Sequence, residues 1–193
     1  MLTNDAWRRC EDVVVVPAAL ALACVGGSVA CLVYLHLAPT GYSPVRNAVS
    51  EYGVGRYARW YGLQAALAGI AAICLAIALG HPRRVVTLLA VLAAARIAIG
   101  WFPTDGTASE EPTWRGGVHL VLALVAFTAA SWAAIALRTG NHGEPWLGWL
   151  MAVFALGTML SLRTSLRPWF GLIERGYYTA MLAWLILVSA RLL

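Results

Sequence analysis

Apolar residues occur in six long runs that are separated by shorter polar connections, and this alternation dominates the chain. The runs cover residues 13–37, 60–79, 85–102, 117–137, 146–162 and 177–192. A run of about 20 apolar residues is long enough to cross the hydrocarbon core of a bilayer as a helix. A spanning segment of this kind is helical because every backbone polar group in lipid needs an internal partner. The pattern predicts an all-α polytopic membrane protein, a bundle of six transmembrane helices that forms one domain over residues 1–193.

The connections between the runs differ in kind. Residues 80–84 and 138–145 form short connections that contain glycine, and both are typical of plain turns. Residues 38–59, 103–116 and 163–176 form longer connections that carry most of the unusual polar side chains. Six crossings place these three long connections at one membrane face and both termini at the other. The arginines divide almost evenly between the two faces, so their distribution predicts no orientation.

The composition also indicates a protein embedded in lipid. The chain of 193 residues is 61% hydrophobic and only 12% charged, whereas about a quarter of the residues in soluble domains are charged. Its net charge of +5 comes from 14 arginines and no lysine. Contacts with lipid headgroups explain this charge more simply than nucleic-acid binding does. The first run is too long for a signal-peptide core, so we expect it to be retained.

Asp105 is the first candidate for an acid, because it follows the third apolar run. Pro103 has no amide hydrogen and restrains Phe102 from helical conformation, so the run should end there. A carboxyl group against the apolar side chains of Trp101 and Phe102 would have a raised pKa and would be able to donate a proton. The alternative is a solvated acid in an ordinary turn with Gly106.

Glu51 is the second candidate and lies in the first long connection. Val45, Val49 and Tyr52 recur at helical spacing, which predicts a short interfacial or re-entrant helix that ends at the glycines 53 and 55. The polar side chains of this helix either point into the bundle or lie among lipid headgroups; they are Arg46, Asn47, Ser50 and Glu51.

Other ionisable residues are predicted near the same membrane face, where such groups are costly and often functional. His119 begins the fourth run and is either catalytic or a hydrogen-bonded structural residue. Glu174 and Arg175 precede the sixth run, where a carboxylate complements the helix dipole. A salt bridge from Glu174 to Arg163 or Arg96 is the structural alternative.

Motifs of well-known enzyme classes are absent from the sequence. It contains no P-loop, G-x-G-x-x-G, H-E-x-x-H or G-x-S-x-G motif. A zinc site needs three protein ligands, and no H-x-x-x-H pair supports one. The four cysteines also lack metal-binding spacing and are typical of small apolar core residues. We therefore expect neither a metal nor another cofactor.

Four short motifs together resemble a bacterial family of small six-span membrane proteins, the domain of unknown function numbered nine hundred and ninety-eight. They are N-x-x-S-E-Y-G (residues 47–53), F-P-T-D (residues 102–105), His119 and E-R (residues 174–175). The resemblance covers nearly the whole chain and implies a multi-pass protein of the bacterial cytoplasmic membrane. That family has no agreed activity, so the resemblance implies architecture rather than function.

The chain is also similar, in size, span count and its acids beside aromatic residues, to small integral-membrane terpene cyclases. Those enzymes use buried carboxylic acids to protonate an alkene or epoxide, although no cyclase motif aligns residue by residue. This similarity implies a metal-independent enzyme that acts on a prenylated small molecule. The proton donor would be Asp105 or Glu51, oriented by His119 or Arg163. Aromatic faces would stabilise the carbocation by about 0.5–2 kcal/mol each, within a dry cavity.

The predicted substrate contacts come from all three long connections and the adjoining runs. The aromatic walls are expected from Tyr52, Trp60, Tyr61, Trp101, Trp114, Trp169, Phe170 and Tyr177. The polar contacts are expected from Arg46, Asn47, Ser50, Arg96, Arg163, Glu174 and Arg175.

Three alternatives to the cyclase hypothesis remain open. The protein would bind or transport membrane lipid if its arginines hold headgroup phosphates. It would be an accessory subunit without catalysis if its polar groups only join helices. A metal-dependent lipid hydrolase is the third alternative. The sequence predicts neither the identity of the substrate nor the oligomeric state.

Overall fold

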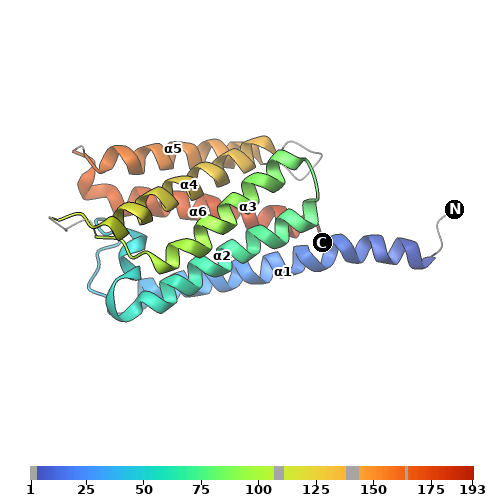
Figure 1. Cartoon of the computed structure of the whole chain (residues 1–193), viewed down its shortest axis with the longest axis horizontal. Helices are drawn as coiled ribbons and strands as arrows, with labels where there is room; N and C mark the ends of the chain where they lie inside the picture. Colours follow the sequence, from blue (N-terminus) through green and yellow to red (C-terminus); the bar gives the residue numbers. More distant parts are fainter. Residues whose placement is uncertain (1–3, 107–110, 138–143, 164) are drawn as a thin grey trace.

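The computed structural model describes residues 4–106, 111–137, 144–163 and 165–193, with side chains from residue 13 onward. These residues form six α-helices and several short 3-10 helices, and they contain no strand. The helices are α1 (Asn4–Leu37), α2 (Ala58–Leu79), α3 (Arg83–Ala98), α4 (Trp114–Ala136), α5 (Pro145–Ser161) and α6 (Phe170–Ala190). They lie side by side along a common direction (Figure 1). The predicted all-α class and the six helices are confirmed.

Four of the helical segments are long and apolar enough to cross a membrane, namely Val13–Leu37, Gly55–Leu79, Arg83–Trp101 and Trp114–Ala136. Helix α5 is apolar but shorter. Helix α6 has 21 residues, but its early turns carry Glu174 and Arg175, which reduce its hydropathy. The structure therefore supports a membrane protein with four clear spanning segments, and six crossings stay a prediction.

Helix ends follow the local signals in the sequence. The third run ends in a 3-10 turn, η3 (Ile99–Trp101), just before Phe102 and Pro103, as predicted. Helix α2 ends at Leu79 and is capped by Gly80, whose φ of 62° belongs to the left-handed region that favours glycine. Helix α6 begins at Phe170 rather than at residue 177, because Glu174 and Arg175 are helical residues and do not interrupt the helix.

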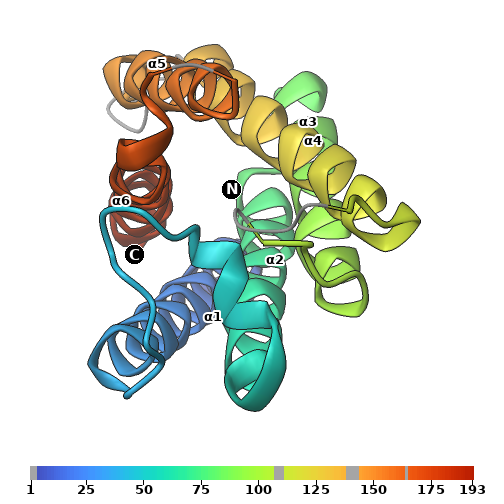
Figure 2. The ribbon, with the colours of Figure 1, turned by 90° about the vertical axis from the view of Figure 1, so that its left-hand side faces the viewer.

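The six helices pack in sequence order into a ring, in which α6 returns to contact α1 (Figure 2). Helix α2 also contacts α6 across the middle of the bundle. The packed faces of α2 and α4 consist largely of buried alanine. Small side chains let neighbouring backbones approach closely, which is how membrane helices commonly associate.

The surface and the interior have the polarity expected of a protein in lipid. Large apolar side chains cover the outside, with Val153 66% exposed, Leu156 61% exposed and Ile77 58% exposed. In contrast, Gln64 and Arg96 are completely or almost completely buried. Lipid accepts apolar surface without cost, whereas polar groups at membrane depth need partners inside the protein.

The three long connections meet at one end of the bundle, and both termini lie toward the other end (Figure 1). The backbone amide of Leu172, at the start of α6, donates to the carbonyl of Val45 in the first connection at 3.1 Å. In that connection the predicted short helix is a 3-10 helix, η1 (Val49–Gly53). This end of the bundle contains the candidate functional site.

Candidate functional site

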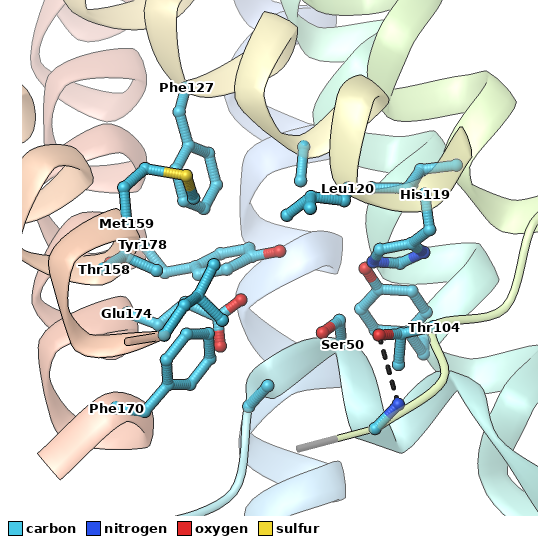
Figure 3. Close-up of a pocket in the computed structure, with 16 residues that line it drawn as sticks. Ser50, Thr104, His119, Leu120, Phe127, Thr158, Met159, Phe170, Glu174 and Tyr178 are labelled. Atoms are coloured by element: carbon cyan, nitrogen blue, oxygen red, sulfur yellow. Dashed lines mark hydrogen bonds between the residues drawn. The ribbon is translucent and has the colours of Figure 1, made fainter. Parts of the chain in front are cut away.

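A cavity of about 100 Å³ lies at the end of the bundle where the long connections meet. Its walls come from η1, α2, η3, α4, α5 and α6, together with the connection that follows η3. Figure 3 shows Glu174, Tyr178 and Phe170 on one side of this space and His119, Thr104 and Ser50 on the other. Residues far apart in the sequence therefore present polar groups to one shared space.

Glu174 is the acidic residue in the cavity wall. Its side chain is only 5% exposed, and Oε2 accepts a hydrogen bond of 2.5 Å from the amide of Val49. No described residue donates to Oε1, and the carboxyl group points into the cavity (Figure 3). The salt bridge to Arg163 or Arg96 that the sequence allowed is not formed among the described residues. One carboxyl oxygen is thus fixed while the other is available to a ligand.

A buried polar chain connects the cavity to the middle of the bundle. Arg96 donates from Nη1 to the hydroxyl oxygen of Tyr178 and from Nη2 to Oε1 of Gln64, each at 2.8 Å. Gln64 in turn donates to the hydroxyl of Ser28 at 3.0 Å. Since Arg96 donates to the phenol oxygen, Tyr178 keeps its own hydroxyl hydrogen as a donor.

His119 and Tyr61 form the opposite polar wall. The Nδ1 atom of His119 lies 2.6 Å from the carbonyl oxygen of Phe102. A carbonyl only accepts, so Nδ1 carries the hydrogen and a neutral ring keeps Nε2 as an acceptor. The ring of His119 stacks on Tyr61 with a centroid distance of 6.4 Å. The hydroxyl of Tyr61 is buried in this wall, close to Tyr178.

The remaining cavity wall is apolar and consists mainly of Leu120, Phe127, Met159 and Phe170. The ring of Phe127 is supported from behind by Tyr177, at a centroid distance of 3.9 Å. The hydroxyl of Tyr177 also donates to the Phe127 carbonyl at 3.1 Å, which fixes the pair. A reactive group in this cavity would therefore meet a few polar atoms against a rigid aromatic and aliphatic surface.

Asp105 differs from its predicted environment. Its Oδ1 accepts from the hydroxyl of Thr113 at 2.6 Å, and its Oδ2 accepts from the amide of Thr113 at 2.9 Å. These two hydrogen bonds hold the pKa of Asp105 below its ordinary value of 3.8, so the predicted raised pKa is wrong. Asp105 is outside the cavity lining, and its carboxylate anchors the start of α4.

Glu51 is buried, but it is also outside the cavity lining. Its carboxylate accepts from the side-chain amide of Asn47 at 2.6 Å and from the backbone amide of Ala48 at 3.2 Å. These contacts shape the first connection just before η1. Glu51 thereby helps to place Ser50, the member of η1 that does line the cavity.

The predicted substrate-contacting residues fall into three groups. Ser50, Tyr61, His119, Phe170 and Glu174 line the cavity, whereas Arg96 and Tyr177 lie directly behind its wall. Asn47, Tyr52 and Arg175 form a separate cluster in which Arg175 donates to the Asn47 carbonyl at 2.7 Å and to the Tyr52 hydroxyl at 3.1 Å. The remainder are exposed or partly exposed away from the cavity: Arg46, Trp60, Trp101, Trp114, Arg163 and Trp169.

Sequence reasoning missed several residues of the site. Gln64 carried a usable signal, because an amide in the middle of an apolar run is expected to have a partner inside the bundle. Tyr178 resembled a member of the interfacial aromatic belt. Phe127 and Thr158 carried no signal, since nothing distinguishes them from other residues of their apolar runs.

Metal binding receives no support from the described part of the chain, which contains no group of three or more His, Cys, Asp or Glu side chains that could hold an ion. His119 and Glu174 lie in the same cavity but are not joined by a third such ligand there.

Comparison with known proteins adds one match. The sequence profile of the family described as "Protein of unknown function (DUF998)" matches residues 22–191. The chain belongs to this family. The match includes every residue of the cavity, so the site lies within the part of this DUF998 protein that defines the family. No curated protein and no solved structure matched the chain, and similarity to terpene cyclases stays a prediction.

Proposed function

We propose that this DUF998 protein is a membrane enzyme that transfers a proton to or from a lipid-like substrate, with Glu174 as the reacting acid or base. The observation that carries this proposal is a buried carboxyl group with one oxygen held by the Val49 amide and the other open to a cavity. A carboxyl placed in this way is oriented before substrate arrives, which favours proton transfer.

The reaction that best suits this site is the acid-initiated cyclisation or isomerisation of an isoprenoid. The protonated Glu174 gives its proton to an alkene carbon or an epoxide oxygen, and a carbocation forms in the substrate. The aromatic rings of Phe127 and Phe170 then stabilise this cation by about 0.5–2 kcal/mol each. Loss of a proton to Nε2 of His119 or to the Glu174 carboxylate completes the isomerisation without a change in mass.

The size of the cavity indicates how such a substrate is held. A volume of about 100 Å³ suits the reacting end of an isoprenoid rather than the whole molecule. Leu120 and Leu162 line the cavity and are also 46% and 37% exposed, so its wall reaches the outer surface of the bundle between α4 and α5. The remainder of the chain would extend there into lipid, which is already an apolar solvent.

The membrane context completes the proposal. All six helices cross the cytoplasmic membrane of a bacterium, and the cavity lies near one membrane face. Four segments, which contain most of α1 and all of α2, α3 and α4, already have the length and composition for this. A site at that depth admits the polar end of a lipid from the interface and keeps its reacting carbons away from water.

The decisive experiment is an assay of membranes that contain the full chain. A farnesylated and a geranylgeranylated hydroquinone serve as probes, and liquid chromatography coupled to mass spectrometry separates an isomeric product of unchanged mass from the probe. Glu174→Gln is expected to lower the rate by about 10²–10⁴-fold, the usual contribution of a positioned acid or base.

The matched control is Glu144→Gln, which makes the same change at the other end of the bundle, where Glu144 pairs with Arg191. The control should retain full activity. Full activity of a folded Glu174→Gln protein would overturn the proposal. Tight retention of an unconverted probe by the wild-type protein would instead favour lipid binding without catalysis.

A further inference from the structure

The outer face of α6 has a second arrangement that the proposed reaction does not use. Arg175, Thr179 and Ala183 recur at four-residue spacing and therefore lie along one stripe of the helix. This stripe separates two grooves, one between α1 and α6 of about 500 Å³ and one between α5 and α6 of about 600 Å³. All three residues contribute to both grooves.

Both grooves have walls suited to hydrocarbon chains. Val33 and Ile186 line the groove beside α1, and Leu150 and Phe154 line the groove beside α5. On α6 the two grooves extend over residues 175–186 and 172–183, which is about 16 Å each at about 1.5 Å per residue. The hydrocarbon core of a bilayer is about 30 Å thick, so each groove matches the depth of one leaflet.

Arg175 places a positive charge where the two grooves meet, near the end of the bundle that holds the long connections. Four of its five N–H groups donate to described atoms: His36 Nε2, the carbonyls of Asn47 and Gly171, and the Tyr52 hydroxyl. One N–H on Nη2 remains for a ligand. No carboxylate among the described residues forms an ion pair with Arg175, because its neighbour Glu174 turns inward to the Val49 amide.

We infer that the outer face of α6 binds one anionic phospholipid with two acyl chains, its phosphate on Arg175 and one chain in each groove. An arginine side chain that four hydrogen bonds already hold in place loses little conformational entropy when it binds a phosphate. A ridge of Thr179 and Ala183, whose side chains are small, lets the glycerol end of the lipid sit close to the helix while its chains diverge to either side.

This lipid site is separate from the central cavity. Tyr178 lines both the cavity and the groove beside α1 and so stands as the wall between them. Glu174 and Arg175, although adjacent in sequence, point to opposite sides of this wall. Lipid binding here does not depend on the proposed proton transfer, and its test uses a different measurement.

The test is native mass spectrometry of the full chain released from detergent micelles in the presence of defined lipids. Dioleoyl phosphatidylglycerol is the expected ligand, and dioleoyl phosphatidylcholine, lyso-phosphatidylglycerol and farnesyl phosphate are the comparisons. We expect the diacyl anionic lipid to be retained about tenfold more tightly than each comparison lipid, a difference that mass spectrometry of titrated samples resolves.

Two variants probe the two halves of the site. Arg175→Gln removes the charge and should lower phosphatidylglycerol affinity about tenfold, whereas Arg175→Lys keeps the charge and should lower it less. Ala183→Phe fills both grooves and should weaken retention without altering the headgroup contacts. Matched controls are Arg84→Gln and Ala136→Phe, which make the same changes in a single apolar groove between α3 and α4.

Each outcome decides for or against the inference. Unchanged retention by a folded Ala183→Phe protein would overturn it even if Arg175→Gln fails to fold. Equal retention of lyso-phosphatidylglycerol would contradict the use of two grooves, and tighter retention of farnesyl phosphate would identify a single-chain site. Equal losses in the matched controls would show general loss of lipid rather than loss at α6.

Discussion

At the scale of single residues, Gly116 determines where the carboxylate of Asp105 lies. A Cβ atom added to Gly116 would lie only 1.9 Å from Oδ2 of Asp105. The missing side chain therefore lets the carboxylate dock against the first turn of α4, where it accepts two hydrogen bonds from Thr113. A negative charge at a helix N-terminus also complements the helix dipole.

Gly116→Ala is expected to displace Asp105 and to lower the melting temperature by at least about 2 °C in a chain of this size. Gly117→Ala is the matched control because no atom lies within 4 Å of its added Cβ. The control should be neutral or slightly stabilising, since alanine is favoured over glycine inside a helix. Thermal unfolding in detergent measures both. Equal melting temperatures for the two variants would show that the Asp105 contact contributes nothing.

The sequence predicted several residues of the cavity, but it did not predict the direction in which the Asp105 side chain points. Ser50, His119 and Glu174 stood out because polar groups near a membrane face are costly, and Tyr61 was expected as an aromatic wall; all four line the cavity. Asp105 stood out equally, but its direction depends on Thr113, eight residues later, and no pattern in the sequence reports that hydrogen bond. Side-chain direction is decided by such partners rather than by spacing along the run.

At the scale of elements, the first turns of α6 hold the first long connection in place. A Cβ atom on Gly171 would lie 2.3 Å from the carbonyl oxygen of Asn47, so this close approach requires glycine. The Leu172 amide donates a hydrogen bond to the Val45 carbonyl, and the Arg175 guanidinium donates one to the Asn47 carbonyl. These contacts set η1 beside α6 and so bring the Val49 amide to Glu174.

Gly171→Ala is expected to push this connection away from α6 and to cost about 1–3 kcal/mol, as overpacking of a close contact usually does. The atoms that would clash belong partly to the backbone and cannot move aside by rotation. Gly26→Ala in α1 is the control, because its added Cβ meets nothing within 4 Å. Chemical denaturation in mixed micelles compares the two. A Gly171→Ala protein as stable as the control would contradict a tight α6 junction.

The elements themselves were largely predictable, because apolar runs bounded by glycine and proline determine where a membrane helix begins and ends. The end of α2 at Leu79 and the 3-10 turn before Pro103 follow directly from such signals. The start of α6 was predicted too late because Glu174 and Arg175 lower hydropathy without breaking the helix. A hydropathy pattern identifies segments that face lipid. Glu174 and Arg175 face other parts of the protein instead, so they belong to the helix although they are polar.

At the scale of the whole molecule, the arrangement of α5 and α6 bears on the number of crossings. Helix α5 has 17 residues and α6 has 21, or about 25 Å and 31 Å at about 1.5 Å per residue. A bilayer core is about 30 Å thick, so α6 is long enough to cross it and α5 is a few ångströms too short. A mismatch of a few ångströms costs little free energy. Glu144 and Arg191 form an ion pair that joins the two helices at the end far from the cavity.

The connection between α5 and α6 is the segment whose location distinguishes six crossings from four. With six, residue 165 lies on the same membrane side as residue 40, because both belong to long connections. With four, α5 and α6 stay on the other side and residue 165 shares the location of residue 81. The test replaces the four natural cysteines by alanine and then introduces one cysteine at a time. The three variants are Ser165→Cys, Thr40→Cys and His81→Cys, and each is labelled with a membrane-impermeant maleimide in sealed vesicles. We expect residues 165 and 40 to react together from one side and residue 81 from the other. If residue 165 instead reacts from the same side as residue 81, six crossings are excluded. Glu174 and its cavity would then lie outside the bilayer, where a carbocation would meet water.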